Sequence, residues 1–308
     1  MTIYQNLLPQ TRFAQKQKRQ VYHLPEYLVK WRQGQLFIKL SQQANEYNLS
    51  MIEDKQFLVE CLKNSSAKLL RVEHNLGETK IKVWADASEQ AKKVVFLQLP
   101  SNNKLPNKQG RISWVLKRLI DWVGAALLLL ALSPFMLGLI LLISIYMPGP
   151  IFFRQWRVGQ RGKLFQIIKF RTMVVDAEKL HHQVMGNQTG LHKLIDDPRI
   201  TGLGRWMRKY SIDELPQLLN VLRGEMSLVG PRPWALYDAL RISPEGQKRL
   251  NALPGITGRW QVGARSNLLD LEAVNRLDLE YLESWSLSHD LKILILTVTK
   301  VLSGFGAY

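Results

Sequence analysis

The sequence predicts an α+β protein made of two parts. Residues 1–110 form a small N-terminal α+β module, and residues 111–308 form a mostly helical, membrane-associated domain. Three observations support this prediction: short apolar segments within the first 100 residues, a turn-rich stretch at 100–110, and a long uncharged run that begins at Trp122. Stretches rich in Pro, Asn, Ser and Gly typically connect folded units, so we place the boundary in the turn-rich stretch.

Composition bounds the class of protein. The chain has 308 residues, 46% of them hydrophobic, which supports a packed core and excludes a disordered chain. A formal charge of +17 indicates an anionic partner: nucleic acid, acidic lipid headgroups or a phosphorylated substrate. Cys61 is the only cysteine, which excludes an internal disulfide and favours a reducing, cytoplasmic environment. Residues 1–20 contain no long apolar run, so we expect no secretory signal peptide.

The N-terminal module shows helix and strand patterns without a catalytic constellation. Ser50 and Glu53 have the spacing of a capping box, which predicts an amphipathic helix that ends near Lys63. The middle one of three apolar segments alternates clearly between polar and apolar residues, as a half-buried strand does. The three predicted strands are 68–72, 79–84 and 94–99.

The uncharged run from Trp122 to Phe153 predicts a membrane contact, because its roughly 32 residues exceed the 20 or so that cross a bilayer core. Ser133-Pro134 lies near its middle, and proline removes a backbone donor and bends a helix. Each half would measure only about 18 Å, too short to span. Basic residues flank both ends, which favours a re-entrant helix-break-helix over about 115–148. A kinked spanning helix, for which total length argues, is the alternative.

For the remaining region, about 151–308, the sequence predicts mostly helices with short strands, packed around the active site. A turn at 157–163 precedes a strand at 164–170, and a helix is expected over 176–185. The apolar segment 291–302 is too short to cross a membrane, so it lies either at the membrane interface, which we favour, or in the core.

Asp213 and Glu214 are adjacent acids with arginines and lysines on both sides, at 205, 208, 209, 223 and 232. A carboxylate nucleophile that attacks a polyanionic diphosphate needs such cations, or a metal, to neutralise charge. The alternative is a solvated helix N-terminus, in which Ser211 caps the helix and the acids favour the positive end of its dipole.

Further motifs surround this pair in a fixed order. They lie at 117–121, 149–150, 157–159, 169–173, 220–233, 254–258, 285–287 and 306–308. Together they resemble the bacterial sugar transferases, the monotopic polyprenyl-phosphate phosphoglycosyltransferases that begin exopolysaccharide, O-antigen or related glycan assembly. The resemblance covers about residues 112–308, and no part of it falls within the N-terminal module.

The resemblance implies a glycosyl-1-phosphate transferase. Asp213 would attack the β-phosphate of a nucleoside diphosphate sugar, with a UDP-sugar as the expected donor, and release the nucleoside monophosphate. Polyprenyl phosphate would then take the phosphosugar from the covalent aspartyl intermediate. Glu214 would help to bind Mg²⁺, which needs only one or two carboxylates when substrate phosphates complete its shell. The enzyme would lie on the inner (cytoplasmic) membrane, in contact with membrane lipids, with its catalytic domain on the cytoplasmic face.

Four cations match substrate-binding positions of the family. Arg232, between two prolines, and Arg265 match its phosphate-binding arginines, although Gly263-Ala264 stands where Ser-Gly or a similar pair is usual and Arg259 replaces an apolar residue. Lys169 and Arg171 are candidate contacts for the diphosphate or the lipid phosphate; the alternative is that they are solvated strand charges. For Asp197 with Arg199, and for the matching residues Asp278, Tyr281, Trp285 and Asp290, we favour structural packing over substrate contact.

Two other classes of function remain to be weighed. A membrane-tethered nucleic-acid binder would need a concentrated basic patch or an aromatic stacking motif, and the sequence shows neither, so we expect no nucleic-acid partner. A non-catalytic scaffold would use residues 1–110 as its interaction surface, but it need not retain Asp213 and Arg232, and both are present. For the transferase, residues 1–110 are a candidate contact surface for glycosyltransferase or assembly partners.

Overall fold

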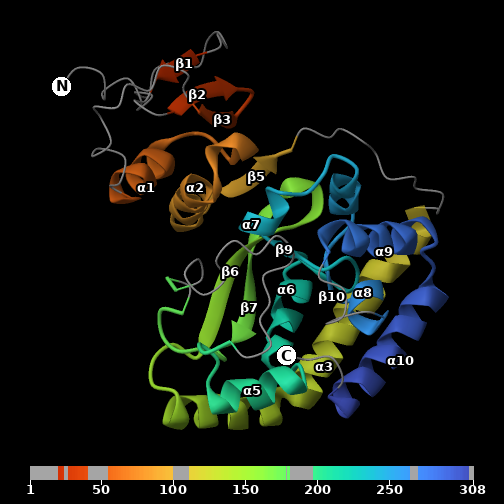
Figure 1. The fold of residues 1–308 in the computed structure, drawn as a ribbon. Coiled ribbons are helices and arrows are strands. Elements are labelled where there is room, and N and C mark those ends of the chain that lie inside the picture. Colours follow the sequence, from red (N-terminus) through yellow and green to blue (C-terminus); the bar gives the residue numbers. More distant parts are fainter. Residues whose placement is uncertain are drawn as a thin grey trace. The chain divides into compact units, whose positions relative to one another are not determined.

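The computed structural model describes residues 20–23, 27–40, 55–99, 111–177, 179–180, 197–263 and 270–304 (Figure 1). Contacts divide the chain into two units, one of residues 1–100 with 161–164 and the other of 101–160 with 165–308. The helices are α1 (Lys55–Asn64), α2 (Glu78–Gln90), α3 (Arg111–Tyr146), α5 (Gly202–Lys209), α6 (Gln217–Leu222), α7 (Leu236–Ala239), α8 (Arg259–Gly263), α9 (Leu271–Glu283) and α10 (Leu287–Ser303). The strands are β1 (Gln20–His23), β2 (Tyr27–Arg32), β3 (Gln35–Leu40), β4 (Leu69–Glu73), β5 (Val94–Gln98), β6 (Phe152–Val158), β7 (Leu164–Phe170), β8 (Ser227–Val229), β9 (Trp234–Ala235) and β10 (Gly255–Thr257).

The first unit is built on one five-stranded sheet in the order β1-β2-β3-β4-β5. Strands β1 to β3 pair antiparallel, whereas β3, β4 and β5 pair parallel, with α1 and α2 as the crossovers. The strands predicted at 68–72 and 94–99 and the helix ending near Lys63 are confirmed. The capping box at Ser50 and Glu53 and the linker at 100–110 lie outside the described residues.

The strand predicted at 79–84 is wrong, because these residues belong to α2. Ile81 and Trp84 also fit helical spacing, and together with Ala85 and Ser88 they form the buried face of the helix. The apparent alternation came from lysines between apolar residues in a segment too short to distinguish the two periods. Strands β1, β2 and β3 were not predicted: β2 and β3 mix charged with apolar residues, and β1 has only four residues.

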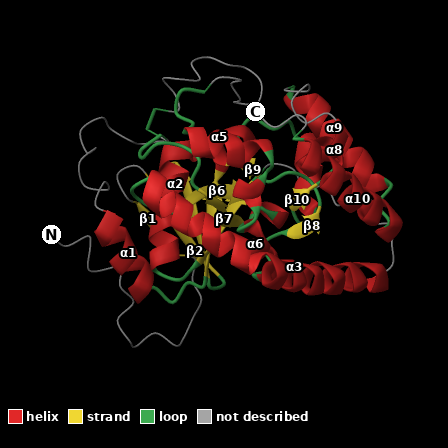
Figure 2. Ribbon diagram, turned by 90° about the horizontal axis from the view of Figure 1, so that it is seen from below, coloured by secondary structure: helices red, strands yellow, loops and turns green. Residues whose placement is uncertain are grey.

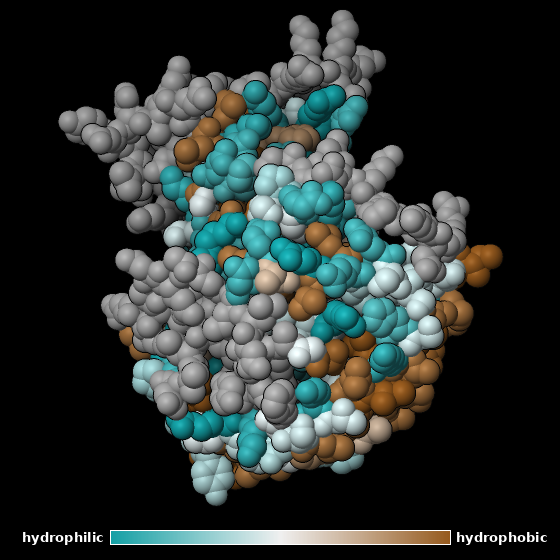
Figure 3. All heavy atoms as spheres, turned by 45° about the vertical axis from the view of Figure 1, so that its right-hand side comes forward, coloured by the Kyte–Doolittle hydropathy of each residue, from teal (hydrophilic) through white to brown (hydrophobic). Residues whose placement is uncertain are grey.

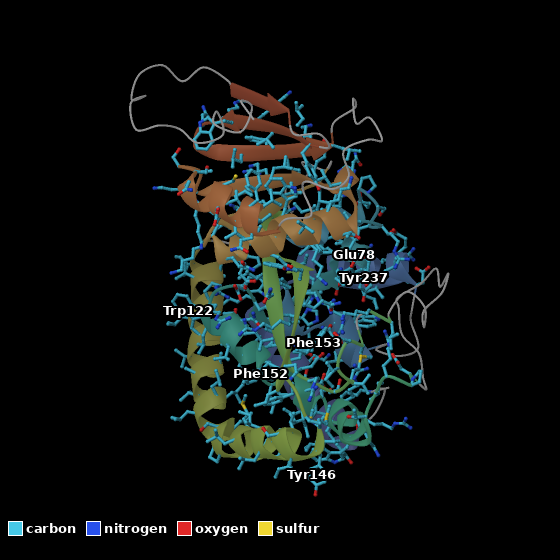
Figure 4. All side chains as sticks on the ribbon, turned by 90° about the vertical axis from the view of Figure 1, so that its left-hand side faces the viewer. Glu78, Trp122, Tyr146, Phe152, Phe153 and Tyr237 are labelled. Carbon is cyan, nitrogen blue, oxygen red and sulfur yellow. The ribbon has the colours of Figure 1, made fainter. Side chains whose placement is uncertain are left out.

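Helix α3 contains Pro134, at which the sequence predicts a bend, and the helix is bent between Trp122 and Tyr146 (Figure 4). Figure 4 shows Trp122 and Tyr146 on two limbs that run in clearly different directions. Pro134 cannot donate to the carbonyl of Leu130 one turn earlier. The hydroxyl of Ser133 donates to that carbonyl instead, at 2.8 Å, so the bend leaves no orphaned acceptor there.

Both limbs of α3 pack on the second unit through one buried side each. The first limb buries Ala125 beside β8 and α6, and the second buries Leu139 and Ile143 against Phe170 and Met207. The opposite sides of both limbs expose large apolar side chains such as Ile112, Leu130, Leu141 and Ile145. A core helix would bury most of its length, but only 17% of the most apolar stretch of α3 is buried. This helix is the one described element long and apolar enough to cross a membrane.

Helix α10 is also apolar on its outer side. It buries Ile293 and exposes Leu291, Ile295, Val298 and Leu302, a distribution that favours the interfacial placement over the core. Figure 2 shows α10 beside α3, and Figure 3 shows apolar side chains gathered over one part of the surface. The strand at 164–170 is confirmed as β7. At 176–180 the described residues form turns rather than the expected helix, and 181–185 lie outside the described residues.

A buried polar network joins the first limb of α3 to the C-terminal helices. The Lys117 ammonium donates to the Asp290 carboxylate at 2.6 Å and to the Val229 carbonyl at 3.0 Å. Asp290 also accepts from the Tyr281 hydroxyl at 2.6 Å and from the Trp285 indole at 3.1 Å. The packing role favoured for these residues is confirmed.

Replacing Lys117 by methionine should destabilise the protein by about 3–5 kcal/mol, because it leaves the buried Asp290 carboxylate without a cation. Thermal or denaturant unfolding in detergent measures this loss. Lys292→Met, which removes an exposed cation from α10, should change stability by less than about 0.5 kcal/mol. Equal effects of the two substitutions would contradict the role given to the network.

Candidate active site

The acidic pair lies on a tight turn and not on a solvated helix N-terminus. Ser211 adopts a left-handed conformation (φ 53°) and makes no side-chain cap hydrogen bond. A single 3-10 turn, Ile212–Glu214, follows it and buries Asp213, which is 7% exposed. Left-handed backbone is uncommon for a residue with a side chain and is often found at functional sites. The solvated-helix alternative therefore does not describe this turn.

Asn220 fixes the turn beside β7. Its side-chain oxygen accepts from the Ile168 amide at 3.0 Å, and its nitrogen donates to the Gln166 carbonyl at 2.8 Å. A fully buried amide thus satisfies the edge of β7 as a neighbouring strand would. Because Asn220 lies on α6, which directly follows the acidic turn, this contact brings the turn to the end of β7.

Two of the predicted substrate-binding cations, Lys169 and Arg232, lie close to Glu214 at the end of β7. Lys169, near the end of β7, places its ammonium 2.5 Å from Glu214 Oε1, and Arg232 Nη1 lies 4.0 Å from the same oxygen. Burial lowers the pKa of Lys169, while attraction to Glu214 and to Asp213 opposes that shift. The structure thus groups Asp213, Glu214, Lys169 and Arg232, whereas a solvated strand charge at Lys169 would have stayed in water.

Two further arginines belong to this group and were missed as site residues. Arg208, on α5, donates through Nε to the Thr172 hydroxyl at 2.8 Å. Burial lowers its pKa, and the nearby Asp213 carboxylate opposes the shift. Arg157, at the end of β6, donates to the Pro233 carbonyl at 3.2 Å, and its pKa is likewise lowered by burial. In the sequence, both arginines were visible only as cations within or near the matched motifs. Their positions along the chain do not show which cations face the acidic turn.

The loop that carries Arg232 is held from behind by a buried ion pair. Arg249 donates through Nη2 to the Arg232 carbonyl at 2.8 Å and to the Asp278 carboxylate. The Arg249 guanidinium lies 4.3 Å from the Trp234 ring, and that of Arg232 lies 5.5 Å from the Trp260 ring. Burial raises the pKa of Asp278 to about 6, and Arg249 opposes that shift. Arg232 therefore keeps a fixed backbone while its side chain stays a third exposed.

Arg171 and Arg265 are the remaining predicted substrate-binding residues. Arg171 donates to the carbonyls of Met147 and Pro148 after the end of α3, so it holds that end of the helix; a contact with substrate stays a prediction. Arg265 lies outside the described residues. Asp197 forms the expected buried pair with Arg199, at 2.6 Å, which holds the pKa of Asp197 below its usual range.

Asp213 and Glu214 are also the acidic groups available for a metal. Within the described ranges no cluster of three or more His, Cys, Asp or Glu side chains could hold an ion unaided. Two adjacent carboxylates are the hard oxygen donors that Mg²⁺ accepts when a phosphorylated ligand supplies further oxygens. The donor set fits that ion only together with a substrate.

Comparison with known proteins extends over the second unit. Residues 112–304 match the family model described as bacterial sugar transferase. A galactosyl transferase, CpsE, from Streptococcus agalactiae is 43% identical over 63% of this chain and 43% of its own length. An undecaprenyl-phosphate galactose phosphotransferase from Salmonella typhimurium is 40% identical, over 66% and 44%. The chain thus spans less than half the length of these two relatives. A UDP-glucose:undecaprenyl-phosphate glucose-1-phosphate transferase from Caulobacter vibrioides is 45% identical, over 62% and 72%.

Arg249→Met should cost about 3–5 kcal/mol of stability at pH 8, because it leaves a buried carboxylate unpaired. Without Arg249 the pKa of Asp278 rises further above its unfolded value, so the folded state takes up a proton and the loss shrinks toward pH 5. Unfolding in detergent at both pH values measures this. The double variant Arg249→Met/Asp278→Leu should recover part of the loss at pH 8; no recovery would show that the charge of Asp278 is not the cause.

Proposed function

We propose that this chain, which belongs to the bacterial sugar transferase family, transfers a phosphosugar from a UDP-sugar to polyprenyl phosphate. One observation carries the proposal: a buried aspartate, Asp213, lies on a fixed turn among the cations Lys169, Arg208 and Arg232. Relatives named as undecaprenyl-phosphate sugar phosphotransferases support the class of reaction. The membrane helix supports a lipid-borne acceptor.

The reaction is written in two displacements. A carboxylate oxygen of Asp213 attacks the β-phosphorus of the donor, and the bond from that phosphorus to the bridging oxygen breaks, so the nucleoside monophosphate leaves with its electron pair. An oxygen of polyprenyl phosphate then attacks the aspartyl phosphosugar, which forms the lipid diphosphate-sugar and returns the carboxylate. In both steps an anionic nucleophile approaches a negatively charged phosphate.

The cations around the turn have separate tasks in this scheme. Arg232 offers a planar guanidinium to donor phosphate oxygens, and the Arg249–Asp278 pair keeps its backbone in place. Lys169 and Arg208 lower the cost of bringing a polyanion to Asp213, because their charges are partly desolvated and therefore act strongly at short range. Glu214, with Asp213, would hold Mg²⁺, which when bound supplies charge neutralisation to the diphosphate.

For the membrane we propose that α3 enters and leaves on the cytoplasmic face of the inner membrane. Both limbs pack against the same unit, and Arg171 fixes the exit of the helix beside β7. A straight spanning helix would carry its second half away from that unit and expose Leu139 and Ile143. The re-entrant arrangement instead keeps the acidic turn at the membrane surface, where a lipid phosphate can reach it.

Asp213→Asn should abolish turnover while the protein stays folded and membrane-bound, because an amide does not accept the phosphoryl group. The measurement is release of uridine monophosphate from a panel of UDP-sugars with polyprenyl phosphate and Mg²⁺. Retention of more than a few per cent of wild-type turnover rules out Asp213 as the nucleophile.

Glu214→Gln should reduce turnover severely, and the residual rate should rise with Mg²⁺ concentration over a range in which the wild-type enzyme is already saturated. Loss of one carboxylate weakens the ion's site without removing Asp213. Initial rates across a Mg²⁺ titration, with EDTA as the control, test this. A wild-type enzyme equally active in EDTA would refute the assignment.

Cysteines placed at Ile112 and Gln160, in a background without Cys61, should both resist a membrane-impermeant thiol reagent in intact cells. Both should react once the cells are permeabilised, which controls for burial. Labelling of position 112 from outside with position 160 protected would establish a spanning helix.

A further inference from the structure

The five-stranded sheet of the first unit has one covered face and one open face. The buried strand residues on the covered face are Tyr27, Val29, Ile38, Leu70, Val72, Val95 and Leu97. Helix α2 packs there, with the Trp84 and Tyr27 rings 5.5 Å apart. On the opposite face no described side chain of β2 to β5 is buried. Parallel strands are normally covered on both faces, so the open face requires an explanation.

The open face is cationic and aromatic. Strand register aligns one row across it, in the order Lys30, Phe37, Arg71 and Phe96. Arg32 and Lys39 add two more cations, and Glu73 is the acid on this face, paired with Lys39 at 2.9 Å. A surface of this composition attracts an anion that also carries a flat apolar part. A second copy docking through the same face would instead oppose cations to cations.

A hollow of about 280 Å³ lies on this face. Its lining residues are Arg32, Gln33, Gln35, Phe37, Arg71 and Gln98. Arg71 is already oriented: its Nε donates to Gln35 Oε1 at 2.8 Å, and its guanidinium lies 5.6 Å from the Phe96 ring. Its two terminal amino groups make no hydrogen bond within the part of the chain that the structure describes. A guanidinium held in this way is ready for a bidentate anion such as phosphate.

We infer that this hollow binds a nucleotide. Arg71 and Arg32 receive the phosphate, the Phe37 ring stacks on the base, and the glutamine amides hydrogen-bond the polar edges of the base and sugar. The volume is at the lower end for ligand sites, which suits one nucleotide rather than a strand. This site belongs to the N-terminal module, for which the sequence indicated no chemistry, and it is independent of the transfer reaction proposed above.

Photo-crosslinking of the full-length protein in detergent tests the site. With 4-thio-UMP or 8-azido-AMP as probe, peptide mapping should find adducts within residues 27–40 or 69–73. Arg32→Gln/Arg71→Gln should lower these adducts at least tenfold, and Lys63→Gln, an exposed cation on α1, should leave them unchanged. Arg232→Gln should lower only adducts in the second unit, so the two sites are read separately. Equal melting temperatures of these variants exclude a folding defect.

Competition identifies the chemistry. Unlabelled UMP or AMP should displace the probe from residues 27–40 and 69–73, whereas uridine, adenosine and inorganic phosphate at the same concentration should not, because each lacks one half of the ligand. Displacement by inorganic phosphate alone would overturn the nucleotide assignment in favour of a simple anion. Absence of adducts in wild-type protein, or adducts unaffected by the double arginine substitution, would overturn the site. A double variant that only loses self-association would show a subunit interface instead.

Discussion

The buried contact of Lys117 with Asp290 is the constraint on which the second unit depends. An apolar helix that partitions into lipid has no hydrophobic reason to stay with its own soluble domain, because lipid satisfies its surface equally well. The ion pair and the hydrogen bonds from Tyr281 and Trp285 supply a directional reason. They also fix β8, since Lys117 donates to the Val229 carbonyl. The residues after β8 lead directly into the loop of Arg232. The network that anchors α3 therefore also helps to position Arg232.

The acidic turn illustrates a second constraint, which is charge balance. Asp213 and Glu214 are partly buried among Lys169, Arg208, Arg232 and Arg157, so cations exceed carboxylates around the turn. Buried cations without counter-charge are costly. In the proposed reaction, the doubly charged diphosphate of the donor would relieve that cost on binding.

The sequence predicted those features that depend on local chemistry. Proline at 134 predicted the bend, and the turn expected at 157–163 placed the start of the strand that is β7. The prediction failed at 79–84, where the six residues fit both the strand and the helix periodicity. Burial against the sheet favours the helix, and the segment belongs to α2. The grouping of Lys169 with the acidic pair followed from motif matching. The roles of Arg157, Arg208 and Asn220 could not follow, because they depend on contacts between segments dozens of residues apart. The open face of the N-terminal sheet could not be recognised either, because it appears only when the two unpredicted strands β2 and β3 are aligned in register with β4.

In the proposed reaction, Lys169 and Glu214 connect the binding of two ligands, Mg²⁺ and the donor. The Lys169 ammonium lies 2.5 Å from Glu214 Oε1. Mg²⁺ would need the same Glu214 carboxylate as a ligand. Two cations sharing one acid repel each other, so binding of Mg²⁺ favours movement of Lys169 toward another anion. The diphosphate of the donor is that anion. Mg²⁺ and donor should therefore bind with positive coupling. Mg²⁺ displaces the Lys169 ammonium from Glu214, and the donor diphosphate supplies a new partner for that ammonium, so Lys169 is the group that couples the two ligands. A Lys169→Met variant should therefore lose part of this coupling, because Arg232, whose Nη1 lies 4.0 Å from Glu214 Oε1, would be the remaining cation paired with Glu214.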